Sequence, residues 1–506
     1  MGHVEGALFN LLSEAAGQFG KKTAIVFDEQ TLSYSDLDSL LIEFSNALAA
    51  LGVKKGDKVA LYLPNIPQFP IAFFGALRAG VIVTAISPLH REREVTFQLA
   101  DSGAQTIVTT NILKPVVDKV KLGVPLKNVI IAEAGGFGFS GLPNANFVPE
   151  INIKIEPETD LASLQYTGGT TRTPKAAMLT HRNLSANAHQ FAKAINADSS
   201  DVFLVALPLF HIYGLTTSLT TPISVGAKMV LLPRFTPQNA LSTIEQQKVS
   251  VFCGVPTMYQ LLLANAELER HDLSSLRVCI SGAASLPPQV QRQFMEKTDA
   301  LLIEGYGLSE ASPVTHCSPV DNAVLRVGSI GQPLADTEAK IVDLESGRRT
   351  LGVGEVGELV VKGPQIMKGY WQNHKETALV LHDGWLLTGD IARMEADGYF
   401  YIVERKKDLI KHNGYSIYPR ELEDILYEHQ AVKLCAVTGR LDGSGDEVPM
   451  AFVVLKEGAV ASAEELKIFV NDKVAAYKAI HQVEIHEELP LSPAGKVLKR
   501  TLKEQS

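Results

Sequence analysis

From residue 58 onward, short apolar runs rich in β-branched residues alternate with segments in which apolar positions recur every three or four residues. The runs are typical of buried strands, and the segments between them are typical of amphipathic helices. Residues 58–110 and 228–307 follow this alternation most closely. Strands that alternate with helices form right-handed βαβ units, so the pattern predicts an α/β protein with mostly parallel sheets covered on both faces.

The pattern changes near residue 330. Short strands expected at 339–344, 357–363 and 399–404 are separated by turns that contain Gly and Asp, which predicts a small antiparallel or barrel-like part. From residue 407 onward, helical and strand-like segments alternate over about 100 residues, enough for a small α+β domain. We therefore divide the chain into a large N-terminal domain, 1–406, and a small C-terminal domain, 407–506.

The composition is that of an ordinary globular protein, with 46% hydrophobic and 20% charged residues among 506. The net charge of −9 argues against nucleic acid as a partner, because nucleic-acid binding normally requires a basic field. The four cysteines are scattered and form no CxxC pair, as expected for reduced thiols. The N-terminal segment lacks the basic region of a signal peptide, so we expect a cytoplasmic enzyme.

The segment QYTGGTTRTPKAAMLTH, residues 165–181, concentrates groups that bind anions. Glycines allow backbone N–H groups to approach a phosphate closely, and the hydroxyls and cations nearby can complete a polyphosphate cradle. A polar surface turn would explain the Gly, Thr and Pro but not the density of donors. The GxxxxGK[ST] spacing of a Walker A loop is absent, and GVGEVG at 352–357 opens no predicted helix, so a dinucleotide fingerprint is excluded there.

Two further segments, 280–285 (ISGAAS) and 303–310 (IEGYGLSE), end neighbouring predicted strands. The carboxyl ends of parallel strands share one edge of a sheet, so both segments should face one crevice. Tyr306 beside small residues suits a planar base, and Glu310 offers an oxygen ligand for Mg²⁺. Asp390, at the end of GWLLTGD, can accept the hydroxyls of a ribose. Taken alone, each segment is also explained by a tight turn.

Two cationic segments lie in the last hundred residues, ERKKDLIKHNGYSIYPRELE at 404–423 and PLSPAGKVLKRTL at 490–502. Taken alone, they are more simply a solvated face and an ordinary tail.

Together and in this order, these segments resemble the adenylate-forming (ANL) superfamily of acyl-CoA synthetases, luciferases and peptide-synthetase adenylation domains. The resemblance extends from LSYSDLD near residue 32 to Lys496. LQYTGGTT, AMLTHRNL, LPLFHIYG and YGLSE are most similar to bacterial long-chain fatty acyl-CoA ligases and plant 4-coumarate–CoA ligases. The resemblance implies a reaction in two steps. A carboxylic acid and ATP first give acyl-AMP and pyrophosphate, and coenzyme A then reacts with acyl-AMP to give acyl-CoA and AMP. It also implies that Mg²⁺ is required.

The resemblance also implies a role for each matching residue. The residues implied to hold the β- and γ-phosphates are Thr167, Gly168, Gly169, Thr170, Thr171 and Lys175. Those implied around the adenine are Gly282, Ala283, Ala284, Tyr306 and Gly307. The remaining implied roles are the α-phosphate contact for Ser309, the Mg²⁺ ligand for Glu310, the ribose edge for Asp390 and Arg405, and the gate of the acyl pocket for His211.

A mobile C-terminal domain is part of the same expectation. Lys407 is implied as its hinge, Lys411 and Gly414 as part of the thioester-forming face, and Lys496 as the adenylation lysine. Lys496, Glu310, Lys411 and Thr170 are therefore the expected catalytic residues. Carboxylate attack spreads negative charge over the α-phosphate, so positioned cations such as Lys496 are what the first step requires.

The phosphate-binding segment departs from the family pattern TTGxPKG at two glycines, which are Arg172 and Ala176 here. A side chain can obstruct a loop that needs positive φ or a close approach to phosphate. We expect an active enzyme with a shifted ATP affinity, and a catalytically impaired nucleotide- or acyl-binding homologue is the alternative.

The expected acid-binding walls are mostly small or apolar, which favours a medium- or long-chain fatty acid over the alternative, an aryl acid such as a coumarate or a benzoate. Carrier-protein loading and luciferase-like oxygenation share the motifs. Little sequence follows Lys496, which favours CoA over an attached carrier. A peripheral membrane contact and a homodimer are left open.

Overall fold

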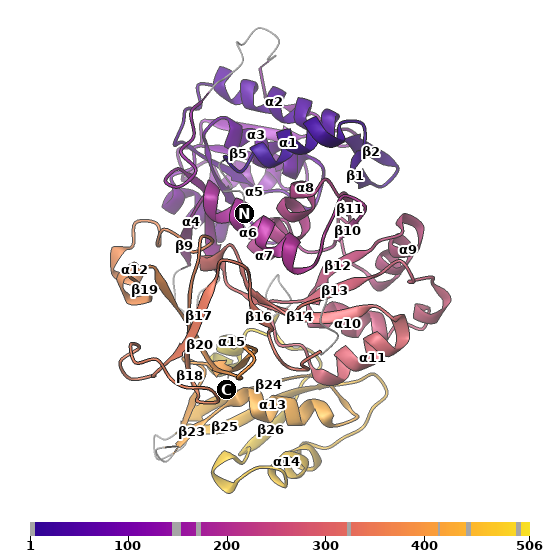
Figure 1. The fold of residues 1–506 in the computed structure, drawn as a ribbon, viewed down its shortest axis with the longest axis vertical. Coiled ribbons are helices and arrows are strands. Elements are labelled where there is room, and N and C mark those ends of the chain that lie inside the picture. Colours follow the sequence, from indigo (N-terminus) through magenta and orange to yellow (C-terminus); the bar gives the residue numbers. More distant parts are fainter. Residues whose placement is uncertain are drawn as a thin grey trace.

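The computed structural model describes residues 6–143, 153–167, 174–320, 325–412, 415–441, 447–491 and 497–505, without the side chains of 415, 416, 504 and 505. Its architecture is the predicted mixed α/β one, with parallel sheets in a large N-terminal part and a smaller C-terminal part (Figure 1). None of the described helices is long and apolar enough to cross a bilayer.

The first parallel sheet has seven strands in the order β7-β6-β5-β3-β4-β8-β9. Its inner pairs are parallel, while β7 and β9 run antiparallel at its two edges. The strands are β3 (Lys58–Leu61), β4 (Ile82–Ala85), β5 (Thr106–Thr110), β6 (Asn128–Ala132), β7 (Phe139–Ser140), β8 (Leu161–Thr167) and β9 (Lys175–Thr180). The helices of this region are α1 (Asn10–Phe19), α2 (Tyr34–Ala50), α3 (Gln68–Arg78), α4 (Glu92–Ser102), α5 (Lys114–Val120) and α6 (His181–Ala194).

The second sheet has nine strands in the order β16-β15-β14-β13-β12-β10-β11-β1-β2. Its central pairs are parallel and its end pairs are antiparallel. The strands are β1 (Thr23–Phe27), β2 (Gln30–Ser33), β10 (Val202–Val205), β11 (Lys228–Leu231), β12 (Val251–Gly254), β13 (Val278–Ser281), β14 (Leu301–Gly307), β15 (Val314–Cys317) and β16 (Gln332–Pro333). The helices between them are α7 (Ile212–Leu215), the π-helical turn η2 (Thr216–Thr220), α8 (Thr221–Ser224), α9 (Pro237–Gln247), α10 (Pro256–Leu263) and α11 (Pro288–Thr298).

The antiparallel part expected after residue 330 is confirmed. It is a sheet in the order β17-β18-β20-β19, with β21 also paired to β20. Its elements are β17 (Glu338–Val342), β18 (Gly357–Lys362), α12 (His374–Val380), β19 (Leu381–His382), β20 (Trp385–Met394) and β21 (Phe400–Arg405). One hydrophobic core includes residues from all three sheets, such as Val83 on β4, Met229 on β11 and Leu359 on β18, so the sheets hold one another in place.

The C-terminal part lies at the bottom of Figure 1 and has its own core, which joins α13, α14, β24 and β25. Its elements are β22 (Ile410–His412), β23 (Tyr415–Ile417), α13 (Pro419–Glu428), β24 (Val432–Leu441), β25 (Glu447–Leu455), α14 (Ala463–Asn471), β26 (Gln482–Ile485) and α15 (Lys499–Gln505). Residue 407 lies between β21 and β22. The domain boundary at this position and the mobility of the domain stay predictions.

Candidate active site

Three of the residues expected at the nucleotide meet around one buried carboxylate. Asp390 on β20 is 3% exposed; its Oδ2 accepts a hydrogen bond of 2.6 Å from the Tyr306 hydroxyl, and its Oδ1 lies 3.0 Å from Nε of Arg405. The Asp390 charge raises the pKa of Arg405, and burial together with Asp390 raises the pKa of Tyr306. Segments about 80 residues apart in sequence thus supply an aromatic ring, an anion and a cation to one place.

The backbone explains why small residues surround this place. A Cβ at Gly307 would lie 2.0 Å from the carbonyl oxygen of Pro313, and a Cβ at Gly282 would lie 2.8 Å from the Tyr213 ring. Ala283 has a φ of 67°, a conformation that L-residues adopt at a cost. β13 and β14 are parallel neighbours, so the segments that follow them share the predicted edge. Ser309 lies two residues after the end of β14 and opens the short 3-10 helix η4 (Ser309–Ala311).

The expected Mg²⁺ ligand and the expected phosphate lysine are linked through one tyrosine. The Tyr370 hydroxyl donates a hydrogen bond of 2.7 Å to Oε1 of Glu310. The ammonium of Lys175 lies 5.1 Å from the centroid of the Tyr370 ring and forms an ion pair with Glu376 on α12. Burial, followed by the charge of Glu310, raises the pKa of Tyr370, so its hydroxyl remains a donor. Neither Tyr370 nor Glu376 was predicted from the sequence.

Main-chain hydrogen bonds fix this linkage. Residues 368–371 pair antiparallel with β9, with Met178 N donating to Gly369 O at 2.9 Å and Trp371 N donating to Ala176 O at 2.8 Å. β9 in turn leads directly into α6, whose first turn is closed by reciprocal hydrogen bonds between Thr180 and Asn183. β9, which begins at Lys175, is therefore held between α6 and residues 368–371.

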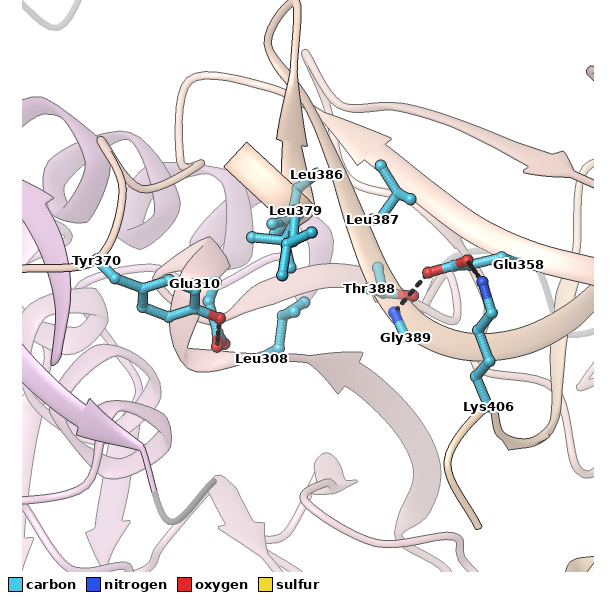
Figure 2. Close-up of a pocket in the computed structure, with 11 residues that line it drawn as sticks. Leu308, Glu310, Glu358, Tyr370, Leu379, Leu386, Leu387, Thr388, Gly389 and Lys406 are labelled. Atoms are coloured by element: carbon cyan, nitrogen blue, oxygen red, sulfur yellow. Dashed lines mark hydrogen bonds and ion pairs between the residues drawn. The ribbon is translucent and has the colours of Figure 1, made fainter. Parts of the chain in front are cut away.

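A cavity of about 200 Å³ lies beside Glu310 (Figure 2). Glu310, Tyr370 and Leu308 line one side, and Thr388 and Gly389 line the other. Polar and apolar groups therefore meet in a space next to the carboxylate expected to bind the metal.

Buried Glu358 fixes the stretch of β20 that carries Asp390. One of its oxygens accepts from Gly389 N at 3.1 Å, and the other lies 2.7 Å from the ammonium of Lys406. Thr388 supports the same stretch, because its hydroxyl accepts from Asp390 N at 3.1 Å and donates to Leu359 O at 2.7 Å. The only sequence signal for Glu358 was its place in the GELVVKG strand, where a charged residue would normally face solvent.

Several predicted site residues lie outside the described part of the chain: Gly168, Gly169, Thr170, Thr171, Arg172, Gly414 and Lys496. Thr167 and Lys175, which flank residues 168–174, form a register pair of β8 and β9. Ala176 lies in β9, is 2% exposed and has no positive φ. An alanine at that position is therefore compatible with the backbone.

His211 lies in the second sheet's helical connection, where it caps α7. Its Nδ1 accepts a hydrogen bond of 3.2 Å from Tyr213 N, and burial lowers its pKa to about 4, so the ring is neutral at neutral pH. The Tyr213 hydroxyl contacts the carbonyl oxygens of Gly254 and Ile280. A role for His211 as a gate stays a prediction.

The C-terminal part contacts β21 close to Arg405. Arg420 on α13 donates from its backbone N to Glu404 at 2.8 Å and from Nη1 to Ile402 O at 2.7 Å. The ammonium of Lys499, three positions after Lys496, lies 2.7 Å from Oε1 of Glu423. Burial opposes the charge of Lys499, but Glu423 and Glu404 outweigh that effect and raise its pKa.

The residues expected at the hinge and the thioester-forming face are close to this contact. Burial, and then the charge of Arg405, lower the pKa of Lys407. Lys411 lies on β22, and its backbone N donates to a Glu447 carboxylate oxygen at 3.0 Å. The roles of Lys407 and Lys411 stay predictions.

Comparison with known proteins identifies the family. Residues 12–371 match the profile described as AMP-binding enzyme, and residues 421–496 match the profile described as AMP-binding enzyme C-terminal domain. The chain belongs to the AMP-binding enzyme family. The expected relationship to adenylate-forming acyl-CoA synthetases is therefore confirmed.

Individual AMP-binding enzymes resemble this chain over almost its whole length. A long-chain-fatty-acid–CoA ligase of Bacillus subtilis is 40% identical and covers 98% of this chain and 94% of its own. 4-Coumarate–CoA ligase 5 of Oryza sativa subsp. japonica is 35% identical and covers 94% of this chain and 89% of its own. The crystal structure of ATP-bound MatB from Rhodopseudomonas palustris superimposes with a TM-score of 0.91 at 28% identity, covering 98% of both chains.

Proposed function

We propose that this AMP-binding enzyme is an ATP-dependent carboxylic acid–CoA ligase whose acid is a medium- or long-chain fatty acid. The observation that carries the proposal is the convergence of Tyr306, Asp390 and Arg405 in a member of this family. A tyrosine ring beside small residues suits adenine, and a fixed carboxylate next to a guanidinium suits the ribose.

In the first half-reaction, the acid attacks the α-phosphate of ATP and pyrophosphate leaves. Lys175 would bind the β- and γ-phosphates together with the phosphate-binding segment, Ser309 would contact the α-phosphate, and Lys496 would stabilise the charge that develops there. No protein nucleophile is needed, because the attacking oxygen belongs to the acid.

Glu310 fits the expected Mg²⁺. Its hydrogen bond from Tyr370 uses one of about four lone-pair positions on the carboxylate, so capacity for a cation remains. Among the described residues, no group of three or more His, Cys, Asp or Glu side chains forms a metal site. This suits an ion that binds mainly to phosphates and is supported by one carboxylate. When bound, Mg²⁺ would neutralise phosphate charge.

In the second half-reaction, the thiol of CoA attacks the acyl carbonyl and AMP leaves. We propose that the C-terminal part rotates about Lys407, which would withdraw Lys496 and bring in the face with Lys411 and Gly414. The contacts of Arg420 with Glu404 and Ile402 would then have to break, so they stabilise the arrangement described above over the rotated one.

The fatty acid is favoured by the 40% identity to a long-chain-fatty-acid–CoA ligase across nearly the whole chain. An aryl acid is the second candidate, favoured by the similarity to 4-coumarate–CoA ligase 5. We further propose a cytoplasmic location; peripheral membrane contact and a homodimer stay predictions.

The test is a panel of saturated fatty acids, 4-coumarate and benzoate, incubated with ATP, Mg²⁺ and CoA. Mass spectrometry then detects acyl-AMP and acyl-CoA. We expect the highest rates with medium- or long-chain acids. Higher rates with the aryl acids would shift the proposal to the second candidate.

Arg172→Gly, assayed by ATP–pyrophosphate exchange, tests the impaired-homologue alternative. We expect exchange in the parental protein and a changed KM for ATP in the variant. No exchange in either protein would defeat the proposal of an active ligase.

A further inference from the structure

The ion pair between Lys175 and Glu376 places a carboxylate within the expected polyphosphate site. Lys175 begins β9 and its side chain is 18% exposed, whereas Glu376 lies on α12 and its side chain is 34% exposed. Lys175 has a role in the proposed function, whereas Glu376 has none so far. A carboxylate that holds a phosphate-binding lysine must affect how that lysine meets its ligand.

The position of Glu376 is fixed by its own helix. Asn373 caps α12 by accepting a hydrogen bond of 3.2 Å from Glu376 N. Thr377 accepts from Tyr370 N at 2.9 Å and donates to Asn373 O at 2.8 Å. Tyr370 lies in the stretch that pairs with β9, so the start of α12 is tied to the strand that begins with Lys175. The ion pair is therefore a consequence of the backbone arrangement.

Two anions compete for one ammonium in this arrangement. Lys175 has three N–H donors, and a polyphosphate that binds it brings several negative charges close to the carboxylate of Glu376. Like charges at such distances repel, and partial burial strengthens both the attraction and the repulsion compared with an exposed pair. The Tyr370 ring beneath the ammonium favours a cation there whichever anion is bound.

We propose that Glu376 is a positioning residue. It forms an ion pair with Lys175 when no polyphosphate is bound, and this ion pair breaks when Lys175 binds the β- and γ-phosphates of ATP. Glu376 keeps Lys175 over Tyr370, and its charge weakens the binding of both ATP and pyrophosphate. The weakened pyrophosphate binding favours product release after adenylation. The proposal rests on the proposed function only through the assignment of Lys175 to the polyphosphate.

The test is Glu376→Gln, which keeps the size of the side chain and removes its charge. Isothermal titration with Mg²⁺ measures dissociation constants for α,β-methylene-ATP, pyrophosphate and AMP, so no turnover is required. We expect the variant to bind the first two roughly three- to tenfold more tightly, and AMP within about twofold of the parental protein, because AMP lacks the phosphates that Lys175 would contact.

Two control variants separate this effect from general charge and folding effects. Asp383→Asn removes a carboxylate from the exposed turn between β19 and β20 and should leave all three constants unchanged. Glu376→Asp keeps the charge and should stay close to the parental constants. Thermal unfolding of each variant checks that the fold is retained.

The outcomes are distinct. Unchanged or weaker binding of the ATP analogue and pyrophosphate by Glu376→Gln overturns the inference, as does an equal gain for AMP. If the parental protein binds neither the ATP analogue nor AMP, the proposed function itself fails. If it binds both nucleotides and Glu376→Gln changes nothing, only the role of Glu376 fails.

Discussion

At the scale of single residues, Asp390 has both carboxylate oxygens engaged by neighbouring side chains. Tyr306 donates to one oxygen and Arg405 lies beside the other. A buried carboxylate held in this way needs little reorganisation when ribose hydroxyls arrive, since its orientation is already set.

Asp390→Asn should therefore weaken the binding of every ligand that contains the ribose. Loss of hydrogen bonds to a charged acceptor corresponds to roughly 10- to 100-fold in affinity. We expect the dissociation constants of ATP and AMP to rise together, while that of pyrophosphate stays the same, by isothermal titration. Equal weakening of pyrophosphate would indicate a general disruption of the site instead.

Lys496→Ala should remove the cation that we propose stabilises the adenylation transition state. We expect ATP–pyrophosphate exchange to fall about 10²- to 10³-fold, with little change in ATP affinity. Lys433→Ala, at an exposed position on β24, is the matched control and should exchange at the parental rate. Exchange at the parental rate in Lys496→Ala would remove that residue from the mechanism.

Residues within continuous motifs could be predicted from the sequence, and residues that act across the fold could not. Tyr306 and Asp390 belong to recognisable segments, and the structure brings them together. Tyr370 and Glu376 lie in GYWQNHKE, a stretch without a phosphate-binding pattern. Their relevance arises only because residues 368–371 pair with β9, a long-range contact that no local pattern specifies.

At the scale of elements, Tyr370 links Lys175, the proposed phosphate-binding cation, to Glu310, the proposed Mg²⁺ ligand. Its ring lies beneath Lys175, while its hydroxyl donates to Glu310. The two functions are separable, because phenylalanine retains the ring and lacks the hydroxyl.

Tyr370→Phe should therefore raise the Mg²⁺ requirement specifically. Hydrogen bonds to metal-ligating carboxylates orient them, and their loss typically costs about 10- to 100-fold in metal affinity. We expect a roughly tenfold higher Mg²⁺ concentration for half-maximal ATP–pyrophosphate exchange. Tyr62→Phe, which removes the hydroxyl bonded to His90 O at 2.7 Å, should show no such shift.

The regular elements were predictable where periodicity was strong. The strands and helices between β3 and β5 and between β11 and β14 lie where the alternation of the sequence places them. The antiparallel pair β8 and β9 was not predicted, because the segment between them was interpreted through its polar, phosphate-binding residues alone. The π-helical turn η2 was also missed, since a run of threonines has no helical apolar stripe.

At the scale of the whole molecule, buried Glu304 on β14 faces the C-terminal part. Burial raises its pKa from 4.5 to about 7, although Arg420 on α13 opposes this shift, and Asp424 on the same helix adds to it. In the native protein this carboxyl keeps a proton that the unfolded chain loses. Between about pH 4.5 and 7 the unfolded chain binds fewer protons, so stability falls as pH rises through this window.

Glu304→Gln should remove this pH dependence. We expect its free energy of unfolding, relative to the parental protein, to increase from pH 5 to pH 8 by at most about 3 kcal/mol. Chemical denaturation at several pH values measures it, with Glu29→Gln in the exposed turn between β1 and β2 as the control. A constant difference across this range would contradict the raised pKa.

Because residues 368–371 pair with β9, the geometry of the site also depends on the number of residues between β18 and Tyr370. Side chains alternate between the two faces of a strand, so a shift by one residue moves each of them to the opposite face. Deletion of one residue between β18 and Tyr370 would therefore turn the tyrosine away from Lys175 and from Glu310 in a single step. A change far from any nucleotide-binding motif would thus break the link through Tyr370 between Lys175, the proposed phosphate-binding cation, and Glu310, the proposed Mg²⁺ ligand, while leaving every motif intact.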